Sequence, residues 1–292
     1  MPCRATCGWR RAGNGRLMDL IQPMAYALFL WWFATGLIFY LDQLPVQTFR
    51  WSMAGATALL GGSLFTVWFT ASDGSVFAVY ASFTAGLIAW GWQEISLYTG
   101  YVTGPRKHSC SAACSGWRHF GHAIAVNLWH EIAIVLGAVA IAALCWKSEN
   151  QWGLWSYLLL WAMHLSARLN VFLGVRNVSA EFVPPHMAVL KSFLTHKPMN
   201  LLFPFSITAA TAGAVLLLSE AIAAQGPSIK AGYSLLAALA CLAVFEHWLL
   251  MLPLPVEKLW QWSMPRRRSA AKLRNTDPDD FNYTAYTNRL TP

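Results

Sequence analysis

Seven apolar runs, each about twenty residues long, constrain this chain more than any other feature of its sequence. A helix of about twenty residues crosses the hydrocarbon core of a bilayer, which is about 30 Å thick. The runs cover residues 22–41, 51–71, 76–98, 123–146, 152–173, 201–224 and 231–252. Glycine, proline and polar residues separate the runs, as expected at helix ends. The pattern predicts an all-α, polytopic membrane helix bundle with about seven transmembrane helices.

The amino-acid composition excludes a large soluble domain. Only 12% of the 292 residues are charged and 56% are apolar, whereas soluble proteins have about 25% charged residues. The formal net charge is +8. In so apolar a chain, basic loops and tails are expected to face anionic lipid rather than nucleic acid. We therefore expect the lipid bilayer as a partner and no nucleic-acid partner.

The distribution of lysine and arginine predicts the orientation in the membrane. Fourteen of these 21 residues lie in the loops 42–50, 99–119 and 174–200 and after the last apolar run, in residues 253–292. Because cytoplasmic loops are enriched in basic residues, we expect a cytoplasmic C-terminus and an N-terminus that faces the periplasm or a lumen. We expect the chain to divide into three segments: a polar, disordered N-terminal extension over 1–20, the bundle over 21–262 and a basic, disordered cytoplasmic tail over 263–292.

Polar residues interrupt several of the apolar runs. His130 and Glu131 lie inside the run 123–146, where an ionised side chain costs about 2.5–3.5 kcal/mol on insertion scales. With the predicted orientation, such residues from four runs and one loop fall in the cytoplasmic leaflet, so we expect them to form one site. They are Glu94, Asn127, His130, Glu131, His164, Arg168, Asn170, Glu181, His186, Glu246 and His247.

Three interpretations of this polar constellation stay open. A structural network would pair Arg168 with a carboxylate, and its other members would be Asn127, His164, Asn170, Glu181 and His186. A metal site for iron, manganese or zinc would use Glu94, His130, Glu131, Glu246 and His247. A tetrapyrrole site would use His130, His164 or His247 as the axial ligand.

The cysteines predict neither a disulfide framework nor a zinc site. None of the six forms a C-x-x-C pair. His108, Cys110, Cys114 and His119 share one loop segment, but their spacing is looser than that of established zinc motifs.

Nine short segments, in this order along the chain, carry a resemblance to a known family. They are Trp31–Gly36, Thr48–Ser52, Trp90–Glu94, Thr103–Arg106, Leu128–Glu131, Leu165–Val175, Glu181–His186, Lys197–Asn200 and Phe245–Trp248. Over roughly residues 24–262 the chain resembles the PuhE family of photosynthetic complex assembly proteins from phototrophic proteobacteria. The resemblance implies an intracytoplasmic-membrane protein that supports build-up of the reaction centre and core light-harvesting complex. It brings no catalytic residues.

Two functions are therefore expected from the sequence, and they leave open whether the protein is an enzyme. The first is an assembly factor that binds reaction-centre or light-harvesting subunits and handles bacteriochlorophyll. The second is a membrane-embedded oxidoreductase, dependent on iron or manganese, that acts on a hydrophobic pigment or quinone-like substrate.

Overall fold

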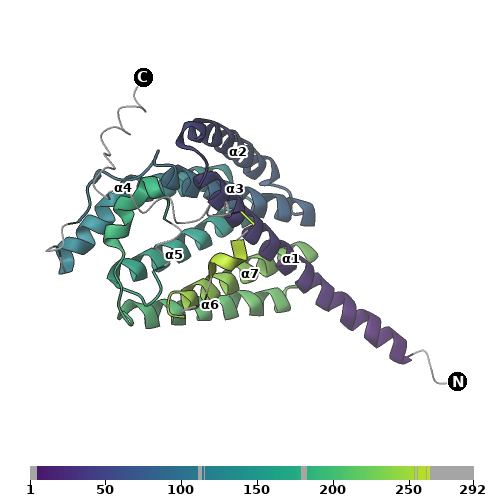
Figure 1. Ribbon diagram of the computed structural model, residues 1–292. Helices are drawn as coiled ribbons and strands as arrows, with labels where there is room; N and C mark the ends of the chain where they lie inside the picture. The colour runs from purple at the N-terminus through teal and green to yellow at the C-terminus, as the bar shows by residue number, and fades with distance from the viewer. Residues whose placement is uncertain are drawn as a thin grey trace.

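A computed structural model describes residues 5–110, 114, 116–178, 183–252, 254, 256–260, 262 and 263, with the side chains of 5–16, 256 and 257 excepted. Within these residues the chain forms seven long α-helices and no named β-strand (Figure 1). They are α1 (Ala5–Asp42), α2 (Phe49–Thr70), α3 (Val76–Tyr98), α4 (Gly116–Leu144), α5 (Trp152–Leu173), α6 (Leu202–Ala223) and α7 (Pro227–Leu249). Short 3-10 helices lie at Val46–Thr48 (η1), Pro185–Phe193 (η3) and Val256–Trp260 (η4).

Five of the helical segments are long and apolar enough to cross a membrane. They are Leu17–Asp42 of α1, Val46–Thr70, and the whole of α4, α6 and α7. This confirms the predicted all-α, multi-pass membrane bundle, because each apolar helix satisfies its own backbone hydrogen bonds in lipid. The helices α3 and α5 are not among these five long, apolar segments. They carry the charged or titratable residues Glu94, His164 and Arg168. Seven spans and the orientation of the chain stay predictions.

The helix α3 lies at the centre of the bundle. It packs against α1, α2, α4, α5 and α7, while α6 packs chiefly on α7. Gly86 and Gly153 allow the backbones of α3 and α5 to meet, because a Cβ on Gly86 would lie 2.4 Å from the Gly153 carbonyl oxygen. Small residues at helix contacts are typical of membrane bundles. This contact brings the polar residues of α3 and α5 together.

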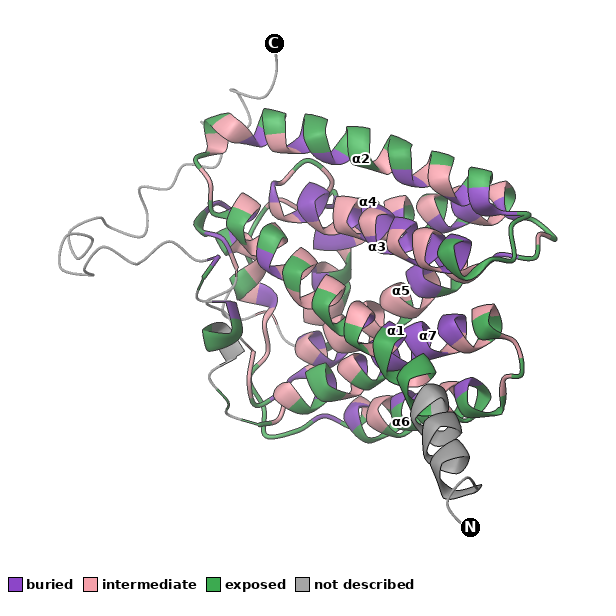
Figure 2. Cartoon of the chain, turned by 90° about the vertical axis from the view of Figure 1, so that its right-hand side faces the viewer, coloured by how far each residue is buried: buried purple, intermediate pink, exposed green. Residues whose placement is uncertain are grey.

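The outer helices expose apolar side chains. The outward side of α2 is exposed along its length (Figure 2), and it includes Leu59, Phe65, Trp68 and Phe69. An apolar face of this extent would be a liability in water, but it suits contact with lipid chains. The exposure pattern therefore agrees with a bundle embedded in a membrane.

Local signals explain where several helices begin and end. Ser75 caps α3 by accepting a hydrogen bond from the Ala78 amide at 3.2 Å. Pro227 occupies the first position of α7, where its missing amide hydrogen is not needed. The helix α1 begins at Ala5, and the division into an extension over 1–20, a bundle and a tail stays a prediction. Residues 264–292 of the expected tail lie outside the described residues.

Candidate functional site

Three potential metal-ligating side chains from three helices meet inside the bundle. Glu94 of α3, His130 of α4 and His164 of α5 each offer a ligand atom, and these atoms lie within 4.8 Å of one another. His164 Nδ1 lies 3.4 Å from Glu94 Oε1. Two ligands on one zinc-sized ion lie about 3–3.5 Å apart, from bond lengths of 2.0–2.2 Å. Two imidazoles and one carboxylate suit iron, manganese or zinc.

His130 is the least satisfied member of this cluster. Its side chain is fully buried, and neither ring nitrogen has a hydrogen-bond partner among the described residues. Buried polar groups without a partner are rare, because desolvation costs about 1–3 kcal/mol. A bound ligand that engages an imidazole nitrogen would remove this penalty.

The loop between α3 and α4 helps to fix the position of His130. The backbone amide of His130 donates to the Thr103 carbonyl oxygen at 2.8 Å. Gly104 next to it allows this close approach, because a Cβ there would lie 2.1 Å from the Ala125 carbonyl oxygen. The motif Thr103–Arg106 therefore packs its backbone directly against α4, one turn before His130.

Beside the cluster lies an ion pair between α4 and α5. Arg168 donates to Glu131 with 2.5 Å between Nη1 and Oε1, and their side chains are only 11% and 22% exposed. Through Nη2, Arg168 also contacts His164 Nε2. The indole of Trp161 donates to the second Glu131 oxygen at 3.4 Å. The positive charge of Arg168 therefore balances the negative charge of Glu131 next to the cluster.

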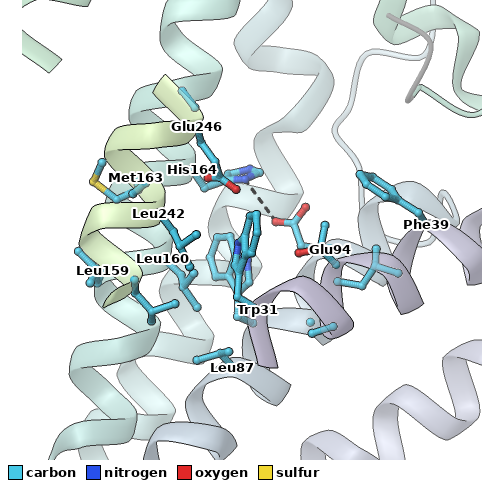
Figure 3. Close-up of a pocket in the computed structure, with 18 of the residues that line it drawn as sticks. Trp31, Phe39, Leu87, Glu94, Leu159, Leu160, Met163, His164, Leu242 and Glu246 are labelled. Atoms are coloured by element: carbon cyan, nitrogen blue, oxygen red, sulfur yellow. Dashed lines mark ion pairs between the residues drawn. The ribbon is translucent and has the colours of Figure 1, made fainter. Parts of the chain in front are cut away.

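An apolar pocket of about 240 Å³ adjoins the cluster between α1, α3, α5 and α7. Apolar and aromatic side chains form most of its wall, including Trp31, Leu87 and Leu242. Glu94, Tyr98, His164 and Glu246 supply its charged or titratable lining. Figure 3 shows the Glu246 carboxylate directed toward Glu94 and His164. The pocket thus combines a mostly apolar wall with a few polar groups at one end.

The five predicted metal ligands, expected at one site, lie in different places in the structure. Glu94 and His130 lie together, Glu131 pairs with Arg168, and Glu246 lies across the pocket. His247 lies apart, because its Nε2 bonds Ser166 Oγ at 2.9 Å and its Nδ1 bonds the Ala243 carbonyl oxygen at 2.8 Å. His164, which we assigned to the polar network and considered as an axial ligand, lies with Glu94 and His130.

The other predicted network residues are distributed around the site. Asn170 donates to Ser206 Oγ at 2.9 Å, and Asn127 is buried with no partner for its Oδ1 among the described residues. His186 contacts the Tyr98 carbonyl oxygen at 2.6 Å, which joins η3 to the end of α3. Glu181 lies outside the described residues.

A second polar contact lies beside the cluster, and sequence reasoning did not identify Tyr157 as part of it. Gln93 donates to Tyr157 Oη at 3.0 Å, and Tyr157 donates to the Ile134 carbonyl oxygen at the same distance. Gly137 gives room for this contact, since a Cβ there would lie 2.6 Å from Tyr157 Oη. The only signal in the sequence was a glutamine within an apolar run.

The chain is similar to known proteins over most of its length. Residues 17–271 match the family described as "Protein of unknown function (DUF3623)". A relative from Rhodobacter capsulatus, described as "Uncharacterized 30.4 kDa protein in puhA 5'region", is 36% identical over 242 residues. The match covers 82% of this chain and 88% of the relative. No solved structure matches the chain.

Proposed function

The chain belongs to the DUF3623 family, and from this premise we propose that it assists assembly of the photosynthetic reaction centre and core light-harvesting complex. The name of the relative, which refers to the puhA region, supports a link to photosynthesis. The resemblance to the PuhE family points in the same direction. The protein acts in the bacterial inner, intracytoplasmic membrane, and its partners are pigment and subunits of these complexes.

The pocket beside Glu94 is the observation that carries this proposal. Ligand sites are typically apolar cavities with a few convergent polar groups, and this pocket has that character. Its volume of about 240 Å³ exceeds that of an engineered cavity of about 150 Å³ that holds benzene. The pocket therefore receives one part of a pigment, such as a ring edge or a prenyl segment, while the remainder contacts lipid or a partner subunit.

The polar end of the pocket would orient the bound pigment. Glu94 and Glu246 face the cavity from α3 and α7, and His164 faces it from α5. Glu94 and Arg168 engage the two ring nitrogens of His164 and hold its imidazole in place, and a carboxylic acid can bond a pigment carbonyl group. Assembly then requires that the pigment be held reversibly, which a small pocket with few polar contacts permits.

A pocket-filling variant tests this function. Gly91 lines the pocket, and a Cβ built on it meets nothing within 4 Å, so Gly91→Leu should fill the cavity without disturbing the fold. Gly62→Leu on α2 is the matched control, because its Cβ also meets nothing within 4 Å and it does not line the pocket. Both variants should reach the membrane at the abundance of the unmodified chain.

The assay is complementation of a Rhodobacter capsulatus strain that lacks its own relative of this chain. We expect the deletion to lower the near-infrared absorbance of assembled complexes. The unmodified chain and Gly62→Leu should restore it, and Gly91→Leu should not. Unchanged absorbance in the deletion strain would contradict the assembly role. Full restoration by Gly91→Leu would contradict the role of the pocket.

The convergence of Glu94, His130 and His164 favours a second candidate function, a metal-dependent oxidoreductase. Iron or manganese held by these side chains would adjoin the apolar pocket, where a pigment or quinone-like substrate could bind. Arg168 would remain beside the ligands as a fixed positive charge. The specific observation in favour of this candidate is that neither ring nitrogen of His130 has a hydrogen-bond partner among the described residues.

Metal analysis of the detergent-purified protein separates the two functions. The oxidoreductase predicts about one iron or manganese per chain, lost in both Glu94→Gln and His130→Gln. The assembly factor predicts co-purifying pigment without stoichiometric metal at these residues. Metal that persists in both variants would exclude this cluster as its binding site.

A further inference from the structure

A second cluster of metal-ligating side chains lies at the start of α4, away from the pocket. Cys110 and Cys114 come from the loop that precedes α4, and His122 lies in the second turn of that helix. The sequence analysis had considered the same cysteines with His108 and His119. The structure instead directs both thiols to His122, eight residues after Cys114.

The geometry of this cluster is that expected around a metal ion. Cys110 Sγ and Cys114 Sγ lie 3.5 Å and 3.3 Å from the same atom, His122 Nδ1. Tetrahedral zinc has Zn–S and Zn–N bonds of about 2.3 Å and 2.0–2.1 Å, so sulfur and nitrogen ligands on one ion are about 3.5 Å apart. The two thiols also contact each other, yet both cysteines are free.

Hydrogen bonding alone accounts poorly for this arrangement. A ring nitrogen has one lone pair or one hydrogen, so it forms one good hydrogen bond in the ring plane. Two thiols directed at His122 Nδ1 therefore compete for a single partner. A metal ion between the three atoms removes the competition, because each side chain then contributes its own ligand atom.

The cluster lies where an ion from the aqueous phase can reach it. With 29 residues, α4 is longer than the approximately 20 residues needed to cross the hydrocarbon core. Its first two turns can therefore extend beyond the hydrocarbon, with polar residues on the predicted cytoplasmic side. Cys110, Cys114 and His122 are all half-buried rather than enclosed.

We propose that Cys110, Cys114 and His122 bind one zinc ion, with water as the fourth ligand. Two thiolates and an imidazole are ligands that zinc prefers. The ion ties the loop after α3 to the start of α4. The same loop supplies the Thr103 carbonyl oxygen that bonds the His130 amide, so the zinc ion helps to hold His130 in position. This inference goes beyond the proposed function and does not depend on it.

Zinc binding at this cluster should depend on pH. Burial raises the pKa of the Cys110 thiol, and contact with Cys114 adds to the rise, while the charges of Arg106 and Arg118 oppose it. Zinc binds the deprotonated forms of cysteine and histidine, so its binding releases protons. We expect the affinity for zinc to rise between pH 6 and pH 8.

The zinc content of the full chain, purified in detergent, tests the inference. We expect about one zinc per chain, with loss of at least about nine-tenths of it in Cys114→Ser and in His122→Gln. His119→Gln, one helical turn earlier, and Cys241→Ala, an exposed cysteine on α7, are matched controls that should retain zinc. Co²⁺ added to the metal-free protein should give a thiolate charge-transfer band that Cys114→Ser abolishes.

Three results would overturn the inference. The first is zinc that is absent from the protein and cannot be loaded into it. The second is zinc that remains in both ligand variants, which would indicate an adventitious ion. The third is a native Cys110–Cys114 disulfide, detected as thiols that resist alkylation until they are reduced. Gly91→Leu, which fills the pocket, should leave the zinc content unchanged, so failure here is distinguishable from failure of the proposed pocket function.

Discussion

Removal of the Glu131 carboxylate should show what the ion pair between α4 and α5 contributes to stability. In Glu131→Gln the side chain keeps its shape, but Arg168 loses its negative partner at 2.5 Å. Breaking a buried pair typically destabilises a protein by about 3–5 kcal/mol, because the remaining charge stays buried without compensation. Arg168 keeps its contact with His164, and Glu131 is 22% exposed. We therefore expect about 3 kcal/mol, the lower end of this range.

A double-mutant cycle isolates the contribution of the pair. Replacing both partners, as in Glu131→Gln with Arg168→Met, removes the stranded charge, so the double variant should be more stable than the sum of the single changes predicts. We expect a coupling energy of about 1–3 kcal/mol. Glu220→Gln, at an exposed position of α6, is the control and should change stability by less than about 0.5 kcal/mol.

Unfolding by sodium dodecyl sulfate in mixed micelles, followed by tryptophan fluorescence, provides the measurement. The chain has 16 tryptophans, and Trp161 contacts Glu131 directly. A coupling energy below about 0.5 kcal/mol, the range of independent sites, would refute the reasoning that Arg168 depends on Glu131.

Two further predictions concern packing and pH. Gly86→Leu should destabilise the bundle by about 1–3 kcal/mol or prevent its folding, because its Cβ would meet the Gly153 carbonyl oxygen. The control Gly213→Leu has open space around its Cβ and should fold normally. Equal yields of folded protein from the two variants would contradict the prediction for Gly86. Burial lowers the pKa of His186 below 6.5 despite its hydrogen bond to the Tyr98 carbonyl oxygen. The unfolded chain therefore binds a proton first as pH falls, so stability should decrease below about pH 6.5. His186→Gln should flatten the dependence of melting temperature on pH between 7 and 5, and an unchanged slope would exclude His186 as its source.

The sequence alone indicated that polar residues of several helices belong together, but it did not determine which of them touch. Periodicity assigns His130 and Glu131 to directions about 100° apart on one helix. It does not give the rotation of that helix relative to its neighbours. Periodicity alone therefore does not separate His247, which bonds Ser166, from His164, which faces Glu94.

The cysteine cluster also shows that the sequence does not determine which side chains touch. Cys110 and Cys114 were visible as a pair in the loop, but their spacing to a histidine matched no established motif. His122 became their partner because α4 begins at Gly116 and its second turn returns toward the loop. Spacing rules succeed only where the connecting backbone has one predictable conformation.

What the sequence determined by itself was the helical, membrane-embedded character of the chain. Long apolar runs allow no other solution in lipid, because every backbone amide and carbonyl group must be paired within its own segment. The tertiary structure decided which helices became internal and which side chains met. Close contact at Gly86 and Gly153 set the approach of α3 and α5, and with it the positions of Glu94 and His164. Such contacts depend on the shapes of both surfaces at once, and no local pattern in one segment encodes them.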